Sequence, residues 1–185
     1  ITKELAPERL EYAKNILIGP PLHDTASEIL GLEHQDSLDE FVQLFIAMHD
    51  ERVIQHTQPY PDVIQVLTQL HKKNIPMAVA TNKRQAPAQK LMDHFGWNDY
   101  FLFIECSDSQ SEMRNKDDMI QDIINQNESF YGSYFVGDTV NDGLSANLNQ
   151  LPFIKACYGY GRDQDWSKVT TYQEIHRFIE ILDLI

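Results

Sequence analysis

Residues 134–147 read YFVGDTVNDGLSAN, and this stretch decides the fold. Residues 134–136 have strand character, Gly137 and Asp138 follow directly, and a helix rich in small residues begins near Asp142. An apolar strand that ends in an acid and turns into a helix brings that carboxylate to the carboxyl edge of a parallel sheet, where open α/β folds bind ligands. We therefore expect Asp138 to face a pocket.

The two acids of this stretch are candidate metal ligands. The spacing of Asp138 and Asp142 lets both carboxylates converge on one hard cation such as Mg²⁺, which takes oxygen ligands and keeps waters that a phosphate can replace. Alternatively, both acids only cap the helix, since Asp at an N-cap or in a first turn is stabilising without any function. Other residues at the same sheet edge decide between the two.

The composition predicts an ordinary globular protein with one sizeable core, alone or with a small appended module. The 185 residues are 42% hydrophobic and 23% charged. The formal net charge of −13 opposes binding to nucleic acid or to an anionic membrane, so a phosphorylated small substrate would need local cations. Cys106 and Cys157 are the only cysteines, which are too few for a disulfide scaffold and favour a reducing cytoplasm. Neither an apolar run of transmembrane length nor a signal peptide is visible in the sequence.

Residues 1–56 are predicted to form a small helical module, and residues 57–185 an α/β domain. Apolar residues recur at helical spacing within 5–17 and again within 41–48. The Gly-Pro-Pro sequence at 19–21 is expected to break the first helical segment. The expected N-caps of the next two helices are Asp24 or Thr25 and Asp36 or Ser37.

Residues 57–185 alternate between helical and strand patterns, which predicts a parallel sheet with helices on both faces. The expected helices span about 61–70, 86–94, 119–125, 141–148 and 172–184. The expected strands span about 75–80, 100–104, 134–136 and 152–156.

Polar groups that suit a phosphate lie at the ends of several of these elements. Thr81 and Asn82 end one strand, and Lys116 opens a helix. Asp138 and Asp142 follow another strand. A hydroxyl, an amide, an ammonium and a pair of carboxylates together supply donors for phosphoryl oxygens, a fixed cation and a Mg²⁺ site.

Each of these groups also has a structural explanation. Thr81 and Asn82 are typical helix-capping residues. Lys116, beside Asp117 and Asp118, has the setting of a solvated surface charge. The order and spacing of the groups together favour the phosphate site.

The motifs resemble those of the haloacid dehalogenase superfamily of phosphatases. ATNK at 80–83, Lys116 placed 22 residues before Asp138, and VGDTVND at 136–142 are similar to the second, third and fourth motifs of that family. The resemblance implies a Rossmann-like parallel-sheet core with a small helical cap. It also implies a Mg²⁺-dependent phosphomonoester hydrolase that works through an aspartyl-phosphate.

Two further stretches are similar to the phosphoglycolate phosphatase branch of the family. IGPPLHDTASEILG at 18–31 resembles its helical cap, and PYPDVIQVL at 59–67 resembles the entry to its core. The implied partner is a small phosphorylated metabolite, with no nucleic acid and no membrane. The identity of the phosphoester and the oligomeric state are left open.

The resemblance also assigns roles to the residues of the motifs. Thr81 would hydrogen-bond the transferring phosphoryl group, with Asn82 beside it, and Lys116 would neutralise charge between nucleophile and phosphate. Asp138 would bind Mg²⁺, and Asp142 would either support the metal or orient Lys116.

Four further residues have two alternative roles, a contact with the substrate or an ordinary structural or surface position. Lys83 follows the second motif and would reach a substrate there, or lie exposed as most lysines do. His23, His34 and His49 lie in the predicted cap and would contact a leaving group, or be surface or satisfied core histidines.

The sequence departs from the family at the nucleophile. Family members attack phosphorus with the first aspartate of a D-x-D-x-T motif and use the second as general acid and base, and no such motif occurs in these 185 residues. The string His-Asp-Thr at 23–25 lies in the cap without a preceding apolar strand and cannot substitute for it. In the family, the strand of this motif lies between the strands that end at Thr81 and at Asp138. We therefore expect a core without its first, central strand.

Such a core leaves backbone groups of both neighbouring strands unpaired, at about 1 to 3 kcal/mol for each buried group. With the start at Ile1 and a cap that lacks a lead-in strand, this suggests an incompletely represented phosphatase that is inactive alone. The alternatives are a catalytically inactive phosphate-binding or regulatory module and a sugar phosphomutase of the same superfamily. A dehalogenase fits less well, because it uses no Mg²⁺.

Overall fold

The chain divides into two units, Ile1–Thr57 and Gln58–Ile185, which are described separately below. The structure is a computed structural model that describes residues 1–15, 22–110 and 114–185. The predicted helix break at 19–21 lies outside these residues. The action of the first unit as a cap stays a prediction.

The first unit is helical throughout its described residues. Its elements are α1 (Thr2–Leu5), η1 (Pro7–Arg9), α2 (Leu10–Lys14), α3 (Leu22–Leu30), η2 (Leu32–Ser37) and α4 (Leu38–His56). The buried apolar residues of its core are Ala6, Ala26, Ile29, Leu30 and Phe41. Because α3 begins at Leu22, Asp24 and Thr25 lie inside the helix and the prediction that one of them caps it is wrong; Asp is favourable in a first turn as well as at a cap.

The second unit alternates helices and strands. Its helices are α5 (Val63–Lys72), α6 (Gln85–Phe95), α7 (Lys116–Gln126) and α8 (Val140–Leu148). Its strands are β1 (Ala78–Thr81), β2 (Phe103–Cys106), β3 (Phe135–Gly137), β4 (Phe153–Ala156) and β5 (Gln173–Ile175). The 3-10 turns are η3 (Asn98–Tyr100), η4 (Glu128–Phe130), η5 (Tyr160–Asp163) and η6 (Phe178–Asp183). Among the helices described in either unit, none combines the length and the apolar character that a membrane crossing requires.

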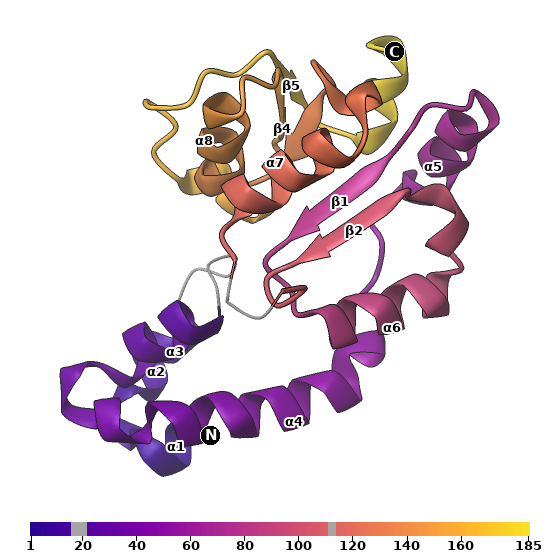
Figure 1. Ribbon diagram of the computed structural model, residues 1–185. Helices are drawn as coiled ribbons and strands as arrows, with labels where there is room; N and C mark the ends of the chain where they lie inside the picture. The colour runs from indigo at the N-terminus through magenta and orange to yellow at the C-terminus, as the bar shows by residue number, and fades with distance from the viewer. Residues whose placement is uncertain (16–21, 111–113) are drawn as a thin grey trace. The chain divides into compact units, whose positions relative to one another are not determined.

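The strands form two separate parallel sheets (Figure 1). β1 pairs with β2, and Thr81 lies opposite Cys106 at their carboxyl ends. β3, β4 and β5 form the second sheet in that order, with Ala156 of β4 opposite Ile175 of β5. Because the strands of each sheet are parallel, the residues that follow them emerge at one edge of that sheet.

Two apolar clusters join both sheets into one layered unit. Phe153 and Ile154 are adjacent on β4 and both fully buried, yet they belong to different clusters, so the clusters lie on opposite faces of the strand. Ile154 packs with α5 and Met77, while Phe153 packs with α7 and α8. Ala78 and Ala80 of β1 also pack against the second cluster. Helices therefore cover both faces, as the alternating pattern predicts.

Four strands of the described residues, β1, β2, β3 and β5, have one unpaired edge, and two of them lead to predicted site residues. Within residues 22–110 and 114–185, β1 pairs with β2 alone and β3 with β4 alone. These are the strands that end at Thr81 and just before Asp138. The unpaired edges of β1 and β3 therefore occur in the two strands between which the sequence predicts that the first core strand is absent.

The predicted closing helix over 172–184 is wrong. Gln173–Ile175 form β5, and Phe178–Asp183 form the 3-10 turn η6. Ile175 is 1% exposed and lies beside β4, where hydrogen bonding to an open strand edge outweighs the helical spacing of the apolar residues. The spacing of apolar residues along the chain does not predict this pairing with β4.

Candidate active site

The turn from β3 into α8 places Asp138. Thr139 is the N-cap of α8, and its hydroxyl accepts a hydrogen bond from the Asp142 backbone N–H (3.2 Å). Asp142 Oδ2 accepts in return from the Thr139 N–H (2.9 Å), the Thr139 hydroxyl (2.7 Å) and the Asp138 N–H (3.2 Å). This capping box fixes the backbone around Asp138. Asp142 therefore takes part in capping α8, as the structural explanation predicts, but that explanation is wrong for Asp138, because the N-cap is Thr139.

The other carboxylate oxygen of Asp142 holds Lys116, the first residue of α7. The Lys116 ammonium donates to Asp142 Oδ1, and the side chains of the pair are only 12% and 7% exposed. Burial alone would raise the pKa of Asp142, but the Lys116 ammonium and the hydrogen bonds from Thr139 outweigh burial and hold that pKa below its ordinary value. At neutral pH the site therefore holds an ionised carboxylate against a fixed ammonium.

Gly137 makes room for this arrangement. A Cβ at position 137 would lie 2.4 Å from the Cβ and 2.8 Å from the Cγ of Asp142. The glycine of the Gly-Asp sequence is therefore required for the close approach of the Asp142 side chain to β3.

The loop after β4 covers the Asp138 carboxylate, which the sequence analysis did not foresee. The Tyr160 N–H donates to Asp138 Oδ2 (2.7 Å), and the Gly161 N–H donates to the Asp138 carbonyl (2.9 Å). A Cβ at Gly159 would lie 2.1 Å from Asp138 Oδ2, and a Cβ at Gly161 would lie 2.2 Å from the Asp138 carbonyl oxygen. The available signal was the sequence Gly-Tyr-Gly shortly after an expected strand, since glycine permits close backbone approach.

Two tyrosines lie close enough to Asp138 for its negative charge to raise the pKa of their phenols. Tyr60 and Tyr158 meet edge-to-face with ring centroids 4.9 Å apart. Burial raises the pKa of Tyr158 to about 12, with smaller contributions from Asp138 and Tyr60. Burial also raises the pKa of Tyr60, with contributions from Tyr160 and Asp138. Both phenols are neutral at physiological pH and can act as hydrogen-bond donors.

Arg114 anchors the segment that leads to Lys116. Its side chain is 5% exposed and forms ion pairs with Glu105 of β2 (2.5 Å) and with Asp122 of α7. Its backbone N–H donates to the Ser107 carbonyl (2.8 Å). These contacts tie the start of α7 to the end of β2 and so fix the backbone of Lys116. The sequence offered no signal for this role, since an arginine near acids is ordinarily a surface charge.

Thr81 and Asn82 lie at the carboxyl end of β1, in the other sheet. Thr81 Oγ1 accepts a hydrogen bond from the Lys83 N–H (3.1 Å). The Lys83 carbonyl accepts from the Ser107 N–H (3.1 Å) and the Ser107 hydroxyl (3.3 Å). These bonds tie the turn after β1 to the end of β2, and the residue Lys83 is exposed.

The structure connects three of the predicted site residues through Asp142, which contacts both of the others. Lys116, Asp138 and Asp142 are joined by the ion pair and by the hydrogen bond from the Asp138 N–H. The approach of Thr81 and Asn82 to this group stays a prediction, because they belong to the separate two-stranded sheet.

The three histidines of the predicted cap lie in the first unit. His34 Nε2 is 2.6 Å from the Glu8 carboxylate, and His49 stacks on Phe45 with ring centroids 5.3 Å apart. His23 is exposed. The contacts of His34 and His49 suit a structural role, and contact with a leaving group stays a prediction for all three.

Comparison with known proteins identifies a family and several relatives of this chain. The family model of haloacid dehalogenase-like hydrolases matches residues 3–156. The phosphoglycolate phosphatase of Agrobacterium fabrum is 32% identical over 127 residues, which are 66% of this chain and 53% of that protein. The tyrosine-protein kinase PtkA of Mycobacterium tuberculosis is 24% identical over 161 residues, which are 86% of this chain and 54% of that protein. The chain therefore spans about half the length of the curated relatives it matches.

Solved structures share the fold. A haloacid dehalogenase-like family hydrolase from Streptococcus pneumoniae superposes with a TM-score of 0.78 at 23% identity, over 90% of this chain and 77% of that chain. The predicted fold class, a Rossmann-like α/β core with parallel strands, is confirmed.

Proposed function

Because the chain belongs to the haloacid dehalogenase-like hydrolase family, we propose that it forms part of a Mg²⁺-dependent phosphomonoester hydrolase for a small phosphorylated metabolite. The observation that carries this proposal is the nearly buried Lys116–Asp142 ion pair beside Asp138. An ammonium that a carboxylate holds in place is a preorganised positive charge for a phosphoryl group. Such a local charge is needed, because the net charge of −13 repels anions.

Asp138 is the residue that best fits a Mg²⁺ ligand. Its Oδ2 accepts a hydrogen bond from Tyr160, and we assign Oδ1 to the cation, since Mg²⁺ prefers carboxylate oxygens. Asp142 has both oxygens engaged by Lys116, Thr139 and the backbone. Of the two roles that the resemblance implies for Asp142, this favours orienting Lys116 over coordinating the metal. When bound, Mg²⁺ would neutralise charge on the phosphoryl oxygens.

The remaining residues would bind and orient the phosphoryl group. Lys116 would contact a phosphoryl oxygen, and the Thr81 hydroxyl and the Asn82 amide would donate hydrogen bonds to the others. The neutral Tyr60 and Tyr158 phenols would face the same region without adding negative charge.

The proposed nucleophile belongs to the first core strand of the family. An aspartate carboxylate attacks phosphorus, and the bond from phosphorus to the leaving oxygen breaks. Water then hydrolyses the aspartyl-phosphate, which releases phosphate and regenerates the carboxylate. The unpaired edges of β1 and β3 support this assignment, because a strand between them would end beside Thr81 and Asp138.

The relatives support a proposal for the substrate class. The similarity to a phosphoglycolate phosphatase favours a small phosphoester such as phosphoglycolate, hydrolysed in the cytoplasm.

The test is phosphate release by the full-length protein from a panel of small phosphoesters, with and without Mg²⁺. We expect Asp138→Asn to abolish Mg²⁺-dependent release, because the amide cannot replace the carboxylate as a ligand. A matched control is Asp163→Asn, since the Asp163 side chain is 89% exposed, and it should keep full activity. Undiminished turnover by Asp138→Asn would refute the assignment of the metal to this residue.

A phosphate-binding module without turnover is the second candidate. The absence of D-x-D-x-T from the 185 residues favours it. In that case Mg²⁺ with phosphate would raise the melting temperature of the full-length protein, and no substrate of the panel would release phosphate.

A further inference from the structure

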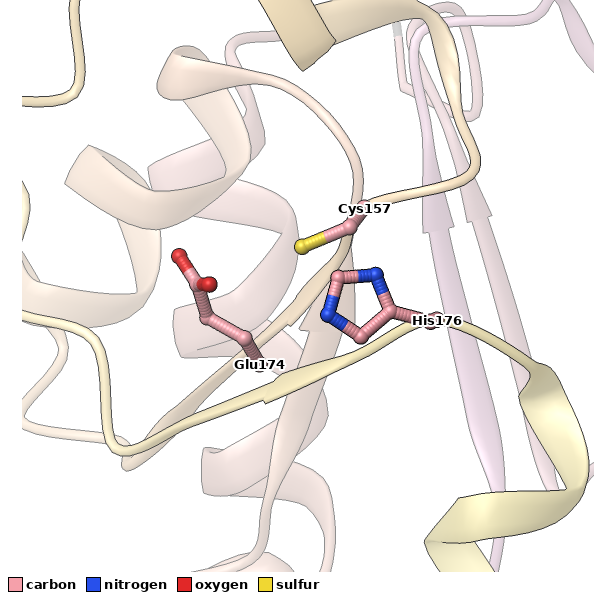
Figure 2. A group of neighbouring side chains, drawn as sticks. All are labelled: Cys157, Glu174 and His176. Atoms are coloured by element: carbon pink, nitrogen blue, oxygen red, sulfur yellow. The ribbon is translucent and has the colours of Figure 1, made fainter.

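Three different metal-binding side chains lie together at the end of β4 and β5 (Figure 2). They are the Cys157 thiol, the Glu174 carboxylate and the His176 imidazole, and one ligand atom of each lies within 4.8 Å of the others. Cys157 is half-buried, while Glu174 and His176 are exposed. None of the three belongs to the proposed phosphatase machinery.

The register of the two strands places these side chains on one face. Lys155 lies opposite Glu174, and the Cys157 N–H donates to the Ile175 carbonyl (2.9 Å), which continues the ladder past the end of β4. Since side chains alternate along a strand, Cys157 shares the face of Lys155, and His176 shares the face of Glu174. The cluster is therefore fixed by the backbone of a parallel pair.

The chemistry of this set selects a particular kind of ion. We propose that Cys157, Glu174 and His176 form a binding site for Zn²⁺ or a similar borderline-soft divalent cation, distinct from the Mg²⁺ site at Asp138. Sulfur and imidazole nitrogen suit Zn²⁺ and disfavour Mg²⁺, and three protein ligands with one open position are a common zinc arrangement. A thiolate and a carboxylate also balance the two positive charges of the ion.

The geometry requires only a small adjustment. In a tetrahedral zinc site, ligand atoms lie roughly 3.4 to 3.8 Å apart, as follows from zinc bond lengths of about 2.0 to 2.3 Å. The ligand-atom separations are at most 4.8 Å, so each needs to close by no more than about 1.5 Å. Glu174 and His176 are exposed, so rotation of their side chains can supply this closure without disturbing the core.

Neighbouring groups already hold two of the ligands. Lys155 Nζ donates to Glu174 Oε1 (2.8 Å) and lies over the Trp166 ring, 4.5 Å from its centroid, which orients the carboxylate. The His176 N–H donates to the Glu180 carboxylate (3.1 Å), which fixes the backbone that carries the imidazole. Contacts of this kind orient metal ligands in known sites.

Cysteine, histidine and glutamate are also the residue types of a catalytic triad, in which the histidine is a base for the nucleophilic cysteine and the acid orients the histidine. Burial raises the pKa of the Cys157 thiol, and Glu174 raises it further. The two uses differ in experiment, because only a metal site gives a thiolate-to-Co²⁺ charge-transfer band.

A bound ion would link the edge strand β5 to β4. β5 contains only three residues, Gln173–Ile175, and it pairs with β4 alone in the described part of the chain. The loop that follows Cys157 is the one whose Tyr160 N–H holds Asp138. We therefore expect the ion to raise the stability of the carboxyl-terminal segment and to order this loop.

The test uses Co²⁺ as a spectroscopic probe for Zn²⁺, added to the full-length protein in excess Mg²⁺. We expect a thiolate-to-Co²⁺ charge-transfer band that Zn²⁺ abolishes by displacement, and a higher melting temperature with Zn²⁺. Cys157→Ser should remove the band. His176→Ala should weaken Co²⁺ binding by about tenfold or more. His176 is exposed, so its replacement leaves the core packing unchanged.

Three control variants separate this site from others. Cys106→Ala removes the other cysteine, His94→Ala removes an exposed histidine outside the cluster, and Asp138→Asn removes the proposed Mg²⁺ ligand. All three should keep the Co²⁺ band. The proposal is overturned if the wild-type protein shows no band, if the band persists in Cys157→Ser, or if His176→Ala binds Co²⁺ as tightly as the wild type.

Discussion

Asp142 performs two tasks with its two carboxylate oxygens. Oδ2 accepts the hydrogen bonds that start α8, and Oδ1 receives the Lys116 ammonium. A helix cap and an ion pair are usually alternative explanations of an acid near a strand end. Here one residue satisfies both, because Gly137 lets its side chain lie against β3.

Replacing this acid should destabilise the fold. Asp142→Asn leaves the Lys116 ammonium nearly buried without its counter-charge, so we expect a loss of about 3 kcal/mol in the free energy of unfolding at neutral pH. Denaturant unfolding measures it. Asp118→Asn, at an exposed acid in the first turn of α7, is the control and should change stability by less than about 1 kcal/mol.

The same pair has a defined pH dependence. Since the folded state lowers the pKa of Asp142, its ionised form stabilises the protein above the ordinary aspartate pKa, and this contribution is lost as the pH falls through the lower, folded pKa. The stability difference between wild type and Asp142→Asn should therefore be complete at neutral pH and shrink below about pH 4. A difference that does not change with pH would show that Asp142 acts through its shape alone.

Gly159 should be essential for the position of Asp138. Its φ of −91° is open to any residue, so Gly159→Ala acts only through its Cβ, which would lie 2.1 Å from Asp138 Oδ2. We expect a displaced carboxylate and about 100-fold slower phosphate release by the full-length protein, with little change in its far-UV circular dichroism. The control is Tyr160→Ala: this side chain is 62% exposed and only its backbone contacts Asp138, so activity should be kept.

At the scale of elements, α6 and α8 end in the same way with different residues, as α5 also does at Asn74 (φ 54°). α6 ends at Gly96 with φ 68°, and the Trp97 N–H donates to the Met92 carbonyl (2.9 Å). α8 is followed by Gln150 with φ 57°, and the Leu151 N–H donates to the Ala146 carbonyl (2.9 Å). A residue with a Cβ has a higher conformational energy than glycine in the left-handed backbone conformation.

This pair of helix ends gives reciprocal predictions. Gln150→Gly should raise the free energy of unfolding by about 0.5 to 1 kcal/mol, while Gln150→Ala should give no gain. Gly96→Ala should lower it by about 1 kcal/mol through backbone strain alone, because a Cβ there meets no atom within 4 Å. Thermal or denaturant unfolding checks both signs. Equal effects of Gly and Ala at position 150 would contradict the conformational explanation.

At the scale of the whole molecule, the second unit shares its core between two sheets that are not hydrogen-bonded to each other in the described residues. Apolar packing on both faces holds them together, while β1 and β3 each keep one edge without a strand. Open edges of this kind accept another strand readily.

A form of the protein that supplies a strand between β1 and β3 should be more stable than residues 1–185 alone. At about 1 kcal/mol for each hydrogen bond formed, we expect a gain of several kcal/mol. Hydrogen exchange measures it by position: amides of Ala78–Thr81 and Phe135–Gly137 should become more protected than those of the edge strand Gln173–Ile175. Equal protection in both forms would place the extra strand elsewhere.

The sequence by itself determined the fold class and the residues around one carboxylate pair. Local rules suffice there, because strand and helix spacing and the Gly-Asp turn depend on neighbours within a few residues, although the N-cap of α8 is Thr139 rather than one of the two acids. The sequence also singled out Lys116, and the resemblance added its role near the phosphate, but its contact with Asp142 spans 26 residues and lies outside any local rule.

Only the tertiary structure decided what depends on distant contacts. The segment after Tyr172 became a strand because β4 offered an open edge, although its spacing suits a helix. The loop with Gly159 and Gly161 covers Asp138 because its backbone fits against that residue. Cys157 and His176 meet because their strands pair in parallel, and such pairing energies between distant segments are absent from any local pattern.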